Sequence, residues 1–240
     1  MFNFLKKKPE REVTPGGSAI YRHDNVDTSR LVLPQNIRLF ADEIDEHFHK
    51  QFPDRETTLY HEVVSNIVHI DINILKPKDR DFHILYTTGM SDLPMTIPDT
   101  VKERDKLMYA ELYMYLPAEW RPEVEDENGK TNYTEDYWAV KLLLYLARFP
   151  HLYKTWLCAS HTIEYYPITK GSLLNGILLE RGEVEPLVAK DGNTVNFYKV
   201  VPITKEEMAF KLKYGYEYLS FKFIEQDFPL VIDVKRKSLI

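Results

Sequence analysis

The pattern of apolar and polar residues is clearest between residues 82 and 87. Phe82, Ile84 and Tyr86 fall on one face of this run, and the residues between them fall on the other. A period of two that is rich in aromatic and β-branched residues predicts a β-strand. The run stops at a polar turn around Gly89, a residue that can adopt backbone conformations others resist. A strand that carries a polar turn to the surface can build a binding site, and an ordinary strand followed by a loop is the alternative.

The same period of two predicts further strands before and after this one. In the segment that precedes it, Val68, Ile70 and Ile72 point one way, while His69 and Asp71 point the other way. Several of these segments follow one another without a clear helix between them, which favours antiparallel neighbours. The predicted strands cover residues 57–64, 68–74, 82–87, 111–116, 155–164, 174–179 and 195–201.

A period of three to four residues predicts helices in the remaining parts of the chain. The first begins its apolar stripe at Ile37, and the second should be closed by Pro150. Thr204 and Glu207 have the spacing of a capping box, which starts a third helix that should end near Gly215. The four predicted helices cover residues 37–52, 138–149, 204–215 and 218–226.

These elements together predict an α+β fold, in which a largely antiparallel or mixed sheet packs with helices. We expect residues 35–240 to form one compact domain, because the apolar segments follow one another without an interior linker. Residues 1–34 show no sustained period, and they are predicted to be a peripheral or flexible segment. The positive charges at residues 235–237 are interpreted as a basic tail.

Composition and charge restrict the possible functions. The net charge of −6 and the pI near 5.8 argue against a nucleic-acid-binding module, which usually has a basic patch. No run approaches the ~18 apolar residues of a membrane helix, so no membrane association is expected. The first residues have their charges after a short apolar stretch, the reverse of a signal peptide, and the single Cys158 cannot form an internal disulfide. We therefore expect a cytoplasmic location.

Several histidines and acidic residues raise the hypothesis of a metal site, and they are His61, Glu62, His69, Asp71, His83 and His161. His69 and Asp71 share one predicted strand face, but no recognised metal-binding spacing is present. A hydrogen-bonded pair that pins its strand to the Gly89 turn is the preferred interpretation, without metal or cofactor. A metal-dependent or hydrolytic enzyme that uses His69, Asp71 and His161 remains the alternative.

The other candidates for catalysis are weaker. Ser91 and Asp92 lack the Gly-x-Ser-x-Gly elbow of a serine hydrolase, and they are expected to satisfy backbone donors within the turn. Cys158 is predicted to lie in a buried strand, as a small apolar side chain. The nine glycines are scattered, so no phosphate-binding loop is predicted.

Several short motifs, in order along the chain, resemble the bacterial branch of the Suppressor of Fused family. The clearest is Thr-Thr-Gly-Met-Ser-Asp-Leu-Pro-Met at residues 87–95, which resembles the signature loop of that family. Ser160 departs from the pattern, because a Gly is expected before His-Thr-Ile. The resemblance runs from about Phe40 to the C-terminus, with further matches at residues 62–72, 137–140, 146–150, 156, 160–163 and 202–208.

The resemblance implies a non-enzymatic protein-binding domain with an α+β fold. Bacterial relatives are proposed to include immunity proteins that neutralise toxins by direct binding, so the expected partner is another protein, such as a basic toxin. The motif positions that it suggests as a binding surface are His69, Asp71, Gly89, Met90, Ser91, Asp92, Pro94, Trp156, His161 and Thr162.

An acidic loop is the second candidate for a partner site. Residues 121–136 contain the turn dipeptide Asn128-Gly129, and acidic side chains are concentrated there. Such a loop could steer a basic partner. The alternative is an ordinary solvent-exposed loop, because runs of charged residues often have no binding role. The candidate steering residues are Glu119, Glu123, Glu125, Asp126 and Glu127.

Overall fold

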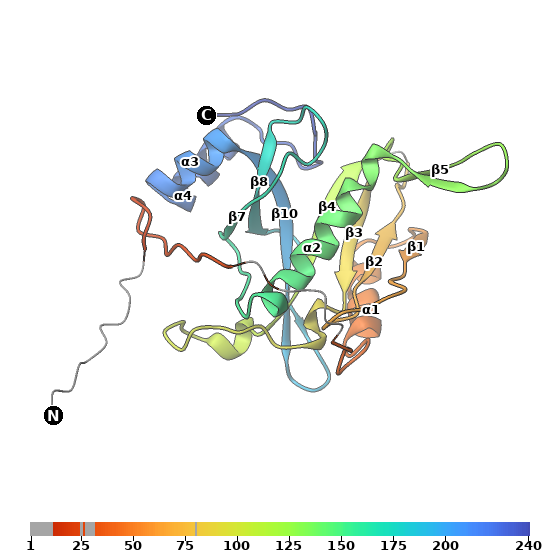
Figure 1. The fold of residues 1–240 in the computed structure, drawn as a ribbon, viewed down its shortest axis with the longest axis horizontal. Helices are drawn as coiled ribbons and strands as arrows, with labels where there is room; N and C mark the ends of the chain where they lie inside the picture. Colours follow the sequence, from red (N-terminus) through yellow and green to blue (C-terminus); the bar gives the residue numbers. More distant parts are fainter. Residues whose placement is uncertain (1–11, 25, 27–31, 80) are drawn as a thin grey trace.

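An eight-stranded sheet forms the centre of the computed structural model, which describes residues 12–24, 26, 32–79 and 81–240 (Figure 1). Neighbouring strands are antiparallel except β4 and β10, which run parallel with Val195 opposite Tyr109. This arrangement confirms the α+β fold with a largely antiparallel, mixed sheet. The spatial order is β1 (Thr57–Tyr60), β2 (Asp71–Leu75), β3 (Phe82–Thr88), β4 (Tyr109–Pro117), β10 (Thr194–Thr204), β8 (Leu174–Arg181) and β7 (Thr162–Glu164), with β9 (Leu187–Val188) paired to β10.

One helix covers each face of the sheet. Helix α1 (Ala41–Gln51) packs Phe48 on Tyr86 of β3, with the ring centroids 3.9 Å apart. Helix α2 (Trp138–Leu152) crosses the other face, where Leu142 joins Leu85 in a separate core cluster (Figure 1). Tyr86 and Leu85 are neighbours in the strand and point to opposite faces, as the alternation in the sequence predicted.

Two short helices close the far end of the sheet, beside β8 and β10. Helix α3 (Lys205–Tyr214) starts with the predicted capping box, since Thr204 Oγ1 accepts from the Glu207 N–H and the Glu207 carboxylate accepts from the Thr204 N–H. Gly215 ends α3 with φ +99°, and helix α4 (Tyr216–Glu225) follows directly. The capping motif and the predicted end of α3 are therefore confirmed.

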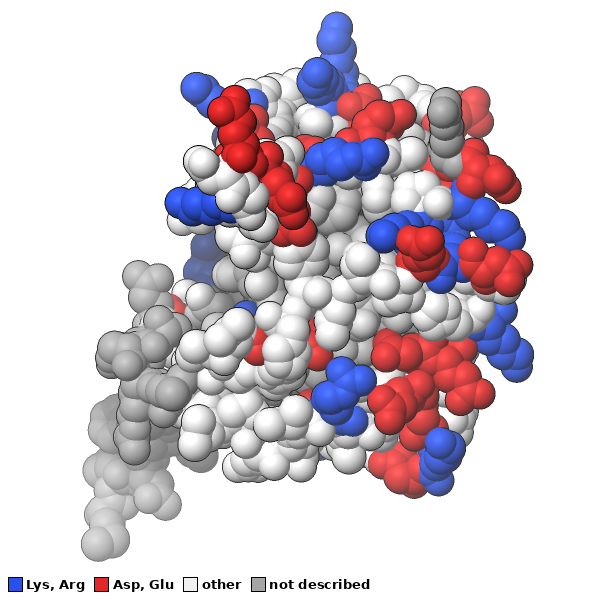
Figure 2. Space-filling model, turned by 90° about the vertical axis from the view of Figure 1, so that its right-hand side faces the viewer, with Lys and Arg blue, Asp and Glu red and all other residues white. Residues whose placement is uncertain are grey.

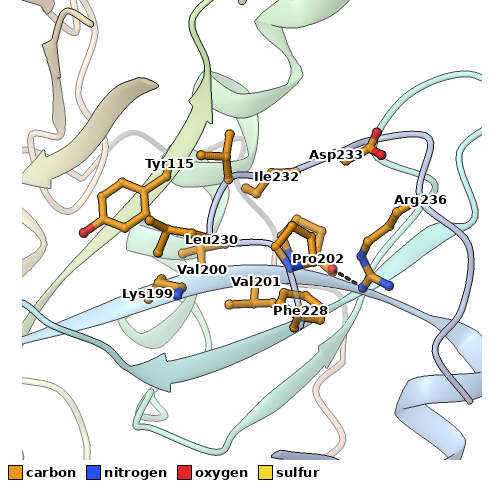
Figure 3. Close-up of a pocket in the computed structure, with 12 residues that line it drawn as sticks. Tyr115, Lys199, Val200, Val201, Pro202, Phe228, Leu230, Ile232, Asp233 and Arg236 are labelled. Carbon is orange, nitrogen blue, oxygen red and sulfur yellow. Dashed lines mark hydrogen bonds between the residues drawn. The ribbon is translucent and has the colours of Figure 1, made fainter. Parts of the chain in front are cut away.

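The C-terminal segment is fastened to the sheet rather than free. The Ile232 N–H donates to the Tyr115 carbonyl of β4 at 3.0 Å. The Arg236 guanidinium donates to the Pro202 carbonyl at 2.9 Å (Figure 3). It also pairs with the buried Glu207 carboxylate at 2.6 Å. The interpretation of residues 235–237 as a basic tail is therefore wrong for Arg236. A cavity of about 10 Å³, enough for about one water molecule, lies under this segment.

Some predicted elements are shorter than expected. Strand β2 begins at Asp71, because Ile67 takes a positive φ of 69° and residues 68–70 run irregularly into the strand. Only the last three residues of the predicted strand 155–164 form β7, and Cys158 lies half-buried before it, where its Sγ accepts from the Tyr198 hydroxyl at 3.6 Å. The assignment of Cys158 to a buried strand was wrong.

Two helix boundaries also differ from the prediction. Helix α1 starts at Ala41, so Ile37 lies outside it and is 62% exposed. Pro150 lies inside α2 and is buried, two residues before the helix ends at Leu152. Contrary to the prediction, the helix therefore does not end before Pro150, because the proline fits into its last turn.

The acidic segment predicted as a loop is a β-hairpin. Its strands are β5 (Glu123–Glu125) and β6 (Thr131–Tyr133), and Figure 1 shows the hairpin projecting from the body of the molecule. Gly129 has φ +74° in the connecting turn, as the Asn128-Gly129 dipeptide predicted. Short 3-10 turns occur at Met90–Asp92, Arg104–Leu107 and Glu135–Tyr137.

The described part of the N-terminal segment contacts the helices. The Gly16 N–H donates to the Leu212 carbonyl at 2.9 Å, and the His23 ring lies 5.0 Å from the Tyr153 ring. Residues 1–11, 25 and 27–31 lie outside the described residues, so the assignment of residues 1–34 as a peripheral segment stays a prediction. Within the described ranges, no helix has the length and apolar character needed to span a membrane.

Candidate functional site

A buried carboxylate of β4 anchors the turn that follows β3. Gly89 has φ +103° there, a left-handed conformation that glycine tolerates well. Glu111 accepts hydrogen bonds from the Gly89 N–H at 3.0 Å and from the Ser91 N–H at 2.9 Å. It also accepts from the hydroxyls of Ser91 and Thr87, each at 2.6 Å. The turn is therefore locked to the neighbouring strand from inside the protein.

Sequence reasoning missed Glu111. Its side chain is fully buried, and burial raises its pKa to about 7, although the hydrogen bonds from Ser91 and Thr87 oppose this shift. A single carboxylate inside the apolar run 111–116 was the signal that could have found it, because a buried charge requires several donors.

Asp92 binds a different segment from the one expected. Its carboxylate accepts from the Leu39 N–H at 2.7 Å and from the Arg38 N–H at 2.8 Å, just before α1. Burial raises the pKa of Asp92, and these two backbone donors lower it. The expectation that Ser91 and Asp92 satisfy donors within the turn was wrong, because Glu111 serves the turn and Asp92 serves the entry to α1.

The structure brings His69 and Asp71 to this turn. Gly89 packs so closely on the His69 carbonyl that a Cβ would lie 1.8 Å from its oxygen, and Asp71 is opposite Thr88 in the β2–β3 register. Asp71 is 1% exposed, and its Oδ2 lies 3.3 Å from the Arg38 guanidinium. His69, Asp71 and the turn therefore form one polar cluster, linked by Arg38 to the segment that Asp92 holds.

His61 joins the same cluster, which the sequence did not predict. Its Nδ1 lies 2.9 Å from Asp71 Oδ1, and His69 Nε2 lies 3.0 Å from the same oxygen. Both imidazoles reach Asp71 because the chain between β1 and β2 turns back irregularly instead of continuing as a strand. These three side chains are the residues of the described chain whose geometry could hold a metal ion.

The remaining motif residues divide between the turn and a second cluster. Met90 is buried and its carbonyl lies 2.9 Å from His151 Nε2, while Pro94 is exposed. The His161 ring packs edge-on against Trp156, with centroids 4.6 Å apart, and Thr162 Oγ1 accepts from Lys211 at 3.4 Å.

His161 does not join His69 and Asp71. Its backbone bonds to Leu179 of β8, which lies four inter-strand spacings from β2, roughly 19 Å. Burial, together with the nearby Lys211 charge, lowers the pKa of His161 to about 4. The combination of His69, Asp71 and His161 that the enzymatic alternative needs is therefore not assembled.

Ser160, the residue that departs from the family motif, adopts φ +64°. This left-handed conformation strains a residue with a Cβ and suits glycine. The N–H of Ser160 bonds to the Leu179 carbonyl at 2.7 Å, so the backbone contact is made in spite of the substitution.

The five candidate steering residues of the hairpin region are exposed, whereas Asp136 is half-buried. Asp126 has a structural role, since it accepts the N–H groups of Asn128 and Lys130 and closes the turn, and these bonds lower its pKa. Figure 2 shows a face of the molecule on which acidic and basic side chains are interspersed, with a larger acidic area towards its lower right. Solvent can reach all of the candidate steering residues, which are Glu119, Glu123, Glu125, Asp126 and Glu127.

An open groove of about 870 Å³ separates β1 from this hairpin. Leu59 and Tyr133 line its two sides and are 46% and 64% exposed. Trp120 lies on its floor with 5% exposure, and Glu123 contributes an acidic group. The groove therefore offers apolar surface beside one acidic side chain, Glu123, and two basic ones, Lys76 and Arg121. His61 also lines it.

A comparison with protein families identifies the fold. Residues 67–237 match the family model described as Suppressor of fused protein (SUFU). The chain belongs to the Suppressor of Fused family. The resemblance seen in the sequence is confirmed, and the match includes the polar cluster from Ile67 onwards, the hairpin and both short helices of this SUFU domain.

Solved structures agree on the fold of the SUFU domain. A crystal structure of a SUFU homolog from Neisseria gonorrhoeae has a TM-score of 0.60 at 16% identity, covering 84% of this chain and 97% of that one. A chain from a Sufu–Fu complex has a TM-score of 0.57 at 15% identity, with coverages of 82% and 91%. Drosophila Suppressor of Fused has a TM-score of 0.56 at 14% identity, and the match covers 82% of this chain but 50% of that one. No curated protein matches by sequence.

Proposed function

We propose that this SUFU domain binds another protein and has no catalytic turnover of its own. The observation that carries the proposal is the family match over residues 67–237, since the structural relative from the Sufu–Fu complex was solved with a protein partner. The separation of His161 from His69 and Asp71 supports it, because the candidate catalytic groups do not converge. A purified chain that turned over a substrate would overturn the proposal.

The proposed binding surface is the groove between β1 and the acidic hairpin. Exposed apolar side chains such as Leu59 and Tyr133 can be desolvated by a partner. The exposed glutamates of the adjoining hairpin favour a basic partner. The net charge of −6 acts in the same direction over a longer range. The finer part of the proposal is an immunity role, in which a basic toxin is neutralised by occlusion.

The experiment begins with a purified basic toxin that forms a stoichiometric complex with the intact chain. Reversing Glu123, Glu125 and Glu127 to Lys should slow association on the order of tenfold at low salt and much less at high salt, because screening removes steering. Stopped-flow or surface plasmon resonance would measure the rates.

The matched control reverses Glu206, Glu217 and Glu225 to Lys on α3 and α4. These residues are also exposed, and the change in net charge is the same. An equal loss in both triple variants would assign the effect to net charge alone. Unchanged association in the hairpin variant would remove the hairpin from the binding surface, whereas failure to form any complex with a basic toxin would remove the immunity role.

A further inference from the structure

Three side chains of potential metal ligands converge where the chain enters β2. We call His61, His69 and Asp71 the His/Asp cluster. One ligand atom from each lies within 4.8 Å of the other two, and both imidazole nitrogens are about 3 Å from Asp71 Oδ1. His61 comes from the end of β1 and the other two from the start of β2, so the β1–β2 pairing assembles the cluster.

The second imidazole has a nitrogen without a hydrogen-bonding partner. His69 is 8% exposed, and its Nδ1 lies 2.5 Å from Ser65 Oγ. Its Nε2 is buried and faces Asp71 Oδ1 at 3.0 Å, but no partner has hydrogen-bond geometry towards it. When Nδ1–H donates to Ser65, the lone pair of Nε2 points at a carboxylate oxygen, and a cation between the two atoms would relieve this repulsion.

The two oxygens of Asp71 face different groups. Oδ2 lies beside the Arg38 guanidinium at 3.3 Å, whereas Oδ1 faces both imidazoles. Oδ1 also accepts the Glu62 N–H at 3.2 Å, which leaves its second lone pair for another group. Arg38 therefore orients the carboxylate from one side and leaves the other oxygen directed into the cluster.

We propose that His61, His69 and Asp71 bind a divalent metal ion of the zinc class. Two imidazoles and one carboxylate are a common donor set for such an ion. Tetrahedral bonds of about 2.0–2.1 Å place ligand atoms about 3.3 Å apart. The two nitrogen–oxygen distances, 2.9 and 3.0 Å, are slightly shorter than this, and the three ligand atoms lie within 4.8 Å of one another, so the imidazoles would have to move to bind an ion. The His61 side chain, 61% exposed, can supply this movement.

The open coordination position faces the solvent beside His61, which lines the groove. Three protein ligands leave room for water or for one side chain of a bound protein. This site is independent of the proposed function, because the ion would bind the isolated chain as well. A cluster held only by hydrogen bonds is the competing interpretation, which the sequence favoured because it placed His69 and Asp71 together but not His61.

The test uses the intact purified chain, stripped of metal with a chelator and titrated with Zn²⁺ in a calorimeter. One equivalent should bind, and His61→Gln or His69→Gln should weaken binding at least tenfold. His23→Gln is the matched control, since it removes an exposed imidazole that contacts the Phe149 and Tyr153 rings and no carboxylate of the cluster. This control should bind Zn²⁺ as the parent chain does.

Titration with Co²⁺ gives a second readout that adventitious binding would not produce. The intense visible absorption of tetrahedral Co²⁺ should appear at one equivalent and be lost in His61→Gln. Because His61 is exposed, the variant should keep its fold, which circular dichroism would verify. No stoichiometric binding, or equal binding by the parent, His61→Gln and His69→Gln, would overturn the proposal. Weaker binding by His23→Gln to the same degree would overturn it too, because the effect would then be general to exposed histidines.

Discussion

At the scale of single residues, one carboxylate determines the shape of the best-defined loop. Glu111 receives hydrogen bonds from two backbone N–H groups and two hydroxyls, and it is shielded from water. The Gly89 N–H and the N–H and hydroxyl of Ser91 would be buried without a partner if the carboxylate were removed, whereas the Thr87 hydroxyl also reaches the Leu112 carbonyl at 3.4 Å. Glu111 therefore holds the position of the whole segment that carries Gly89 and Ser91.

We predict that Glu111→Ala lowers the free energy of unfolding by at least about 3 kcal/mol, since each unsatisfied buried donor costs roughly 1–3 kcal/mol. Urea denaturation of the two proteins measures the difference. Glu119→Ala removes an exposed carboxylate from the other end of the same region and should change stability by less than about 0.5 kcal/mol. A loss for Glu111→Ala no larger than that of Glu119→Ala would contradict the anchoring role.

At the scale of secondary-structure elements, an ion pair joins the C-terminal segment to α3. Arg236 and Glu207 have side-chain exposures of 8% and 0%, and the same carboxylate accepts the Leu239 N–H at 3.1 Å. The capping box of α3 and the C-terminal segment therefore share one carboxylate. Disturbing that group should affect both elements together.

We predict that Arg236→Met destabilises the protein by about 3–5 kcal/mol, because it leaves the Glu207 carboxylate buried without its counter-ion. The neighbouring changes Lys235→Met and Lys237→Met remove exposed cations and should have effects below about 0.5 kcal/mol. Thermal and urea unfolding would measure all three variants. Similar losses in all three would show that charge at this end, and not the buried pair, matters.

The periodicity of apolar residues predicted the elements whose structure depends on residues close in sequence. It failed where contacts between distant parts of the chain determine the backbone conformation. The alternation of β3 and the capping box at Thr204 depend on neighbours in sequence, so both were predictable. The irregular course of residues 68–70 and the position of Cys158 depend on packing against other parts of the chain. For the same reason the sequence paired His69 with Asp71 but could not place His61 beside them.

At the scale of the whole molecule, several histidines are held neutral inside the fold. Burial lowers the pKa values of His83, His151 and His161, and that of His161 falls to about 4. The unfolded chain therefore binds a proton at each site at a higher pH than the folded chain does. Such groups contribute stability above pH 6.5, and that stability is lost as the pH falls towards the lowered pKa.

For His161 the window lies between pH 6.5 and about 4. We predict that His161→Gln reduces the fall in unfolding free energy across this window by up to about 1.4 kcal/mol per pH unit, the contribution of one proton. Chemical denaturation at several pH values measures the slope. His23→Gln replaces an exposed histidine, and its unfolding free energy should change with pH at the same slope as that of the parent chain. If the unfolding free energies of the parent chain, His161→Gln and His23→Gln changed with pH in parallel, the conclusion that His161 is buried in its neutral form would be contradicted.

The parallel pairing of β4 with β10 has a consequence for how the protein is made. Tyr109 pairs with Val195, and the chain between them includes the hairpin, α2, β7 and β8. During synthesis β4 emerges with β3 already available on one side, while its other edge stays unpaired until β10 leaves the ribosome. An open strand edge attracts strands of other chains. The growing chain therefore passes through a stage in which the edge of β4 is unpaired and a chaperone would protect it from aggregation. In the finished sheet β10 covers that edge.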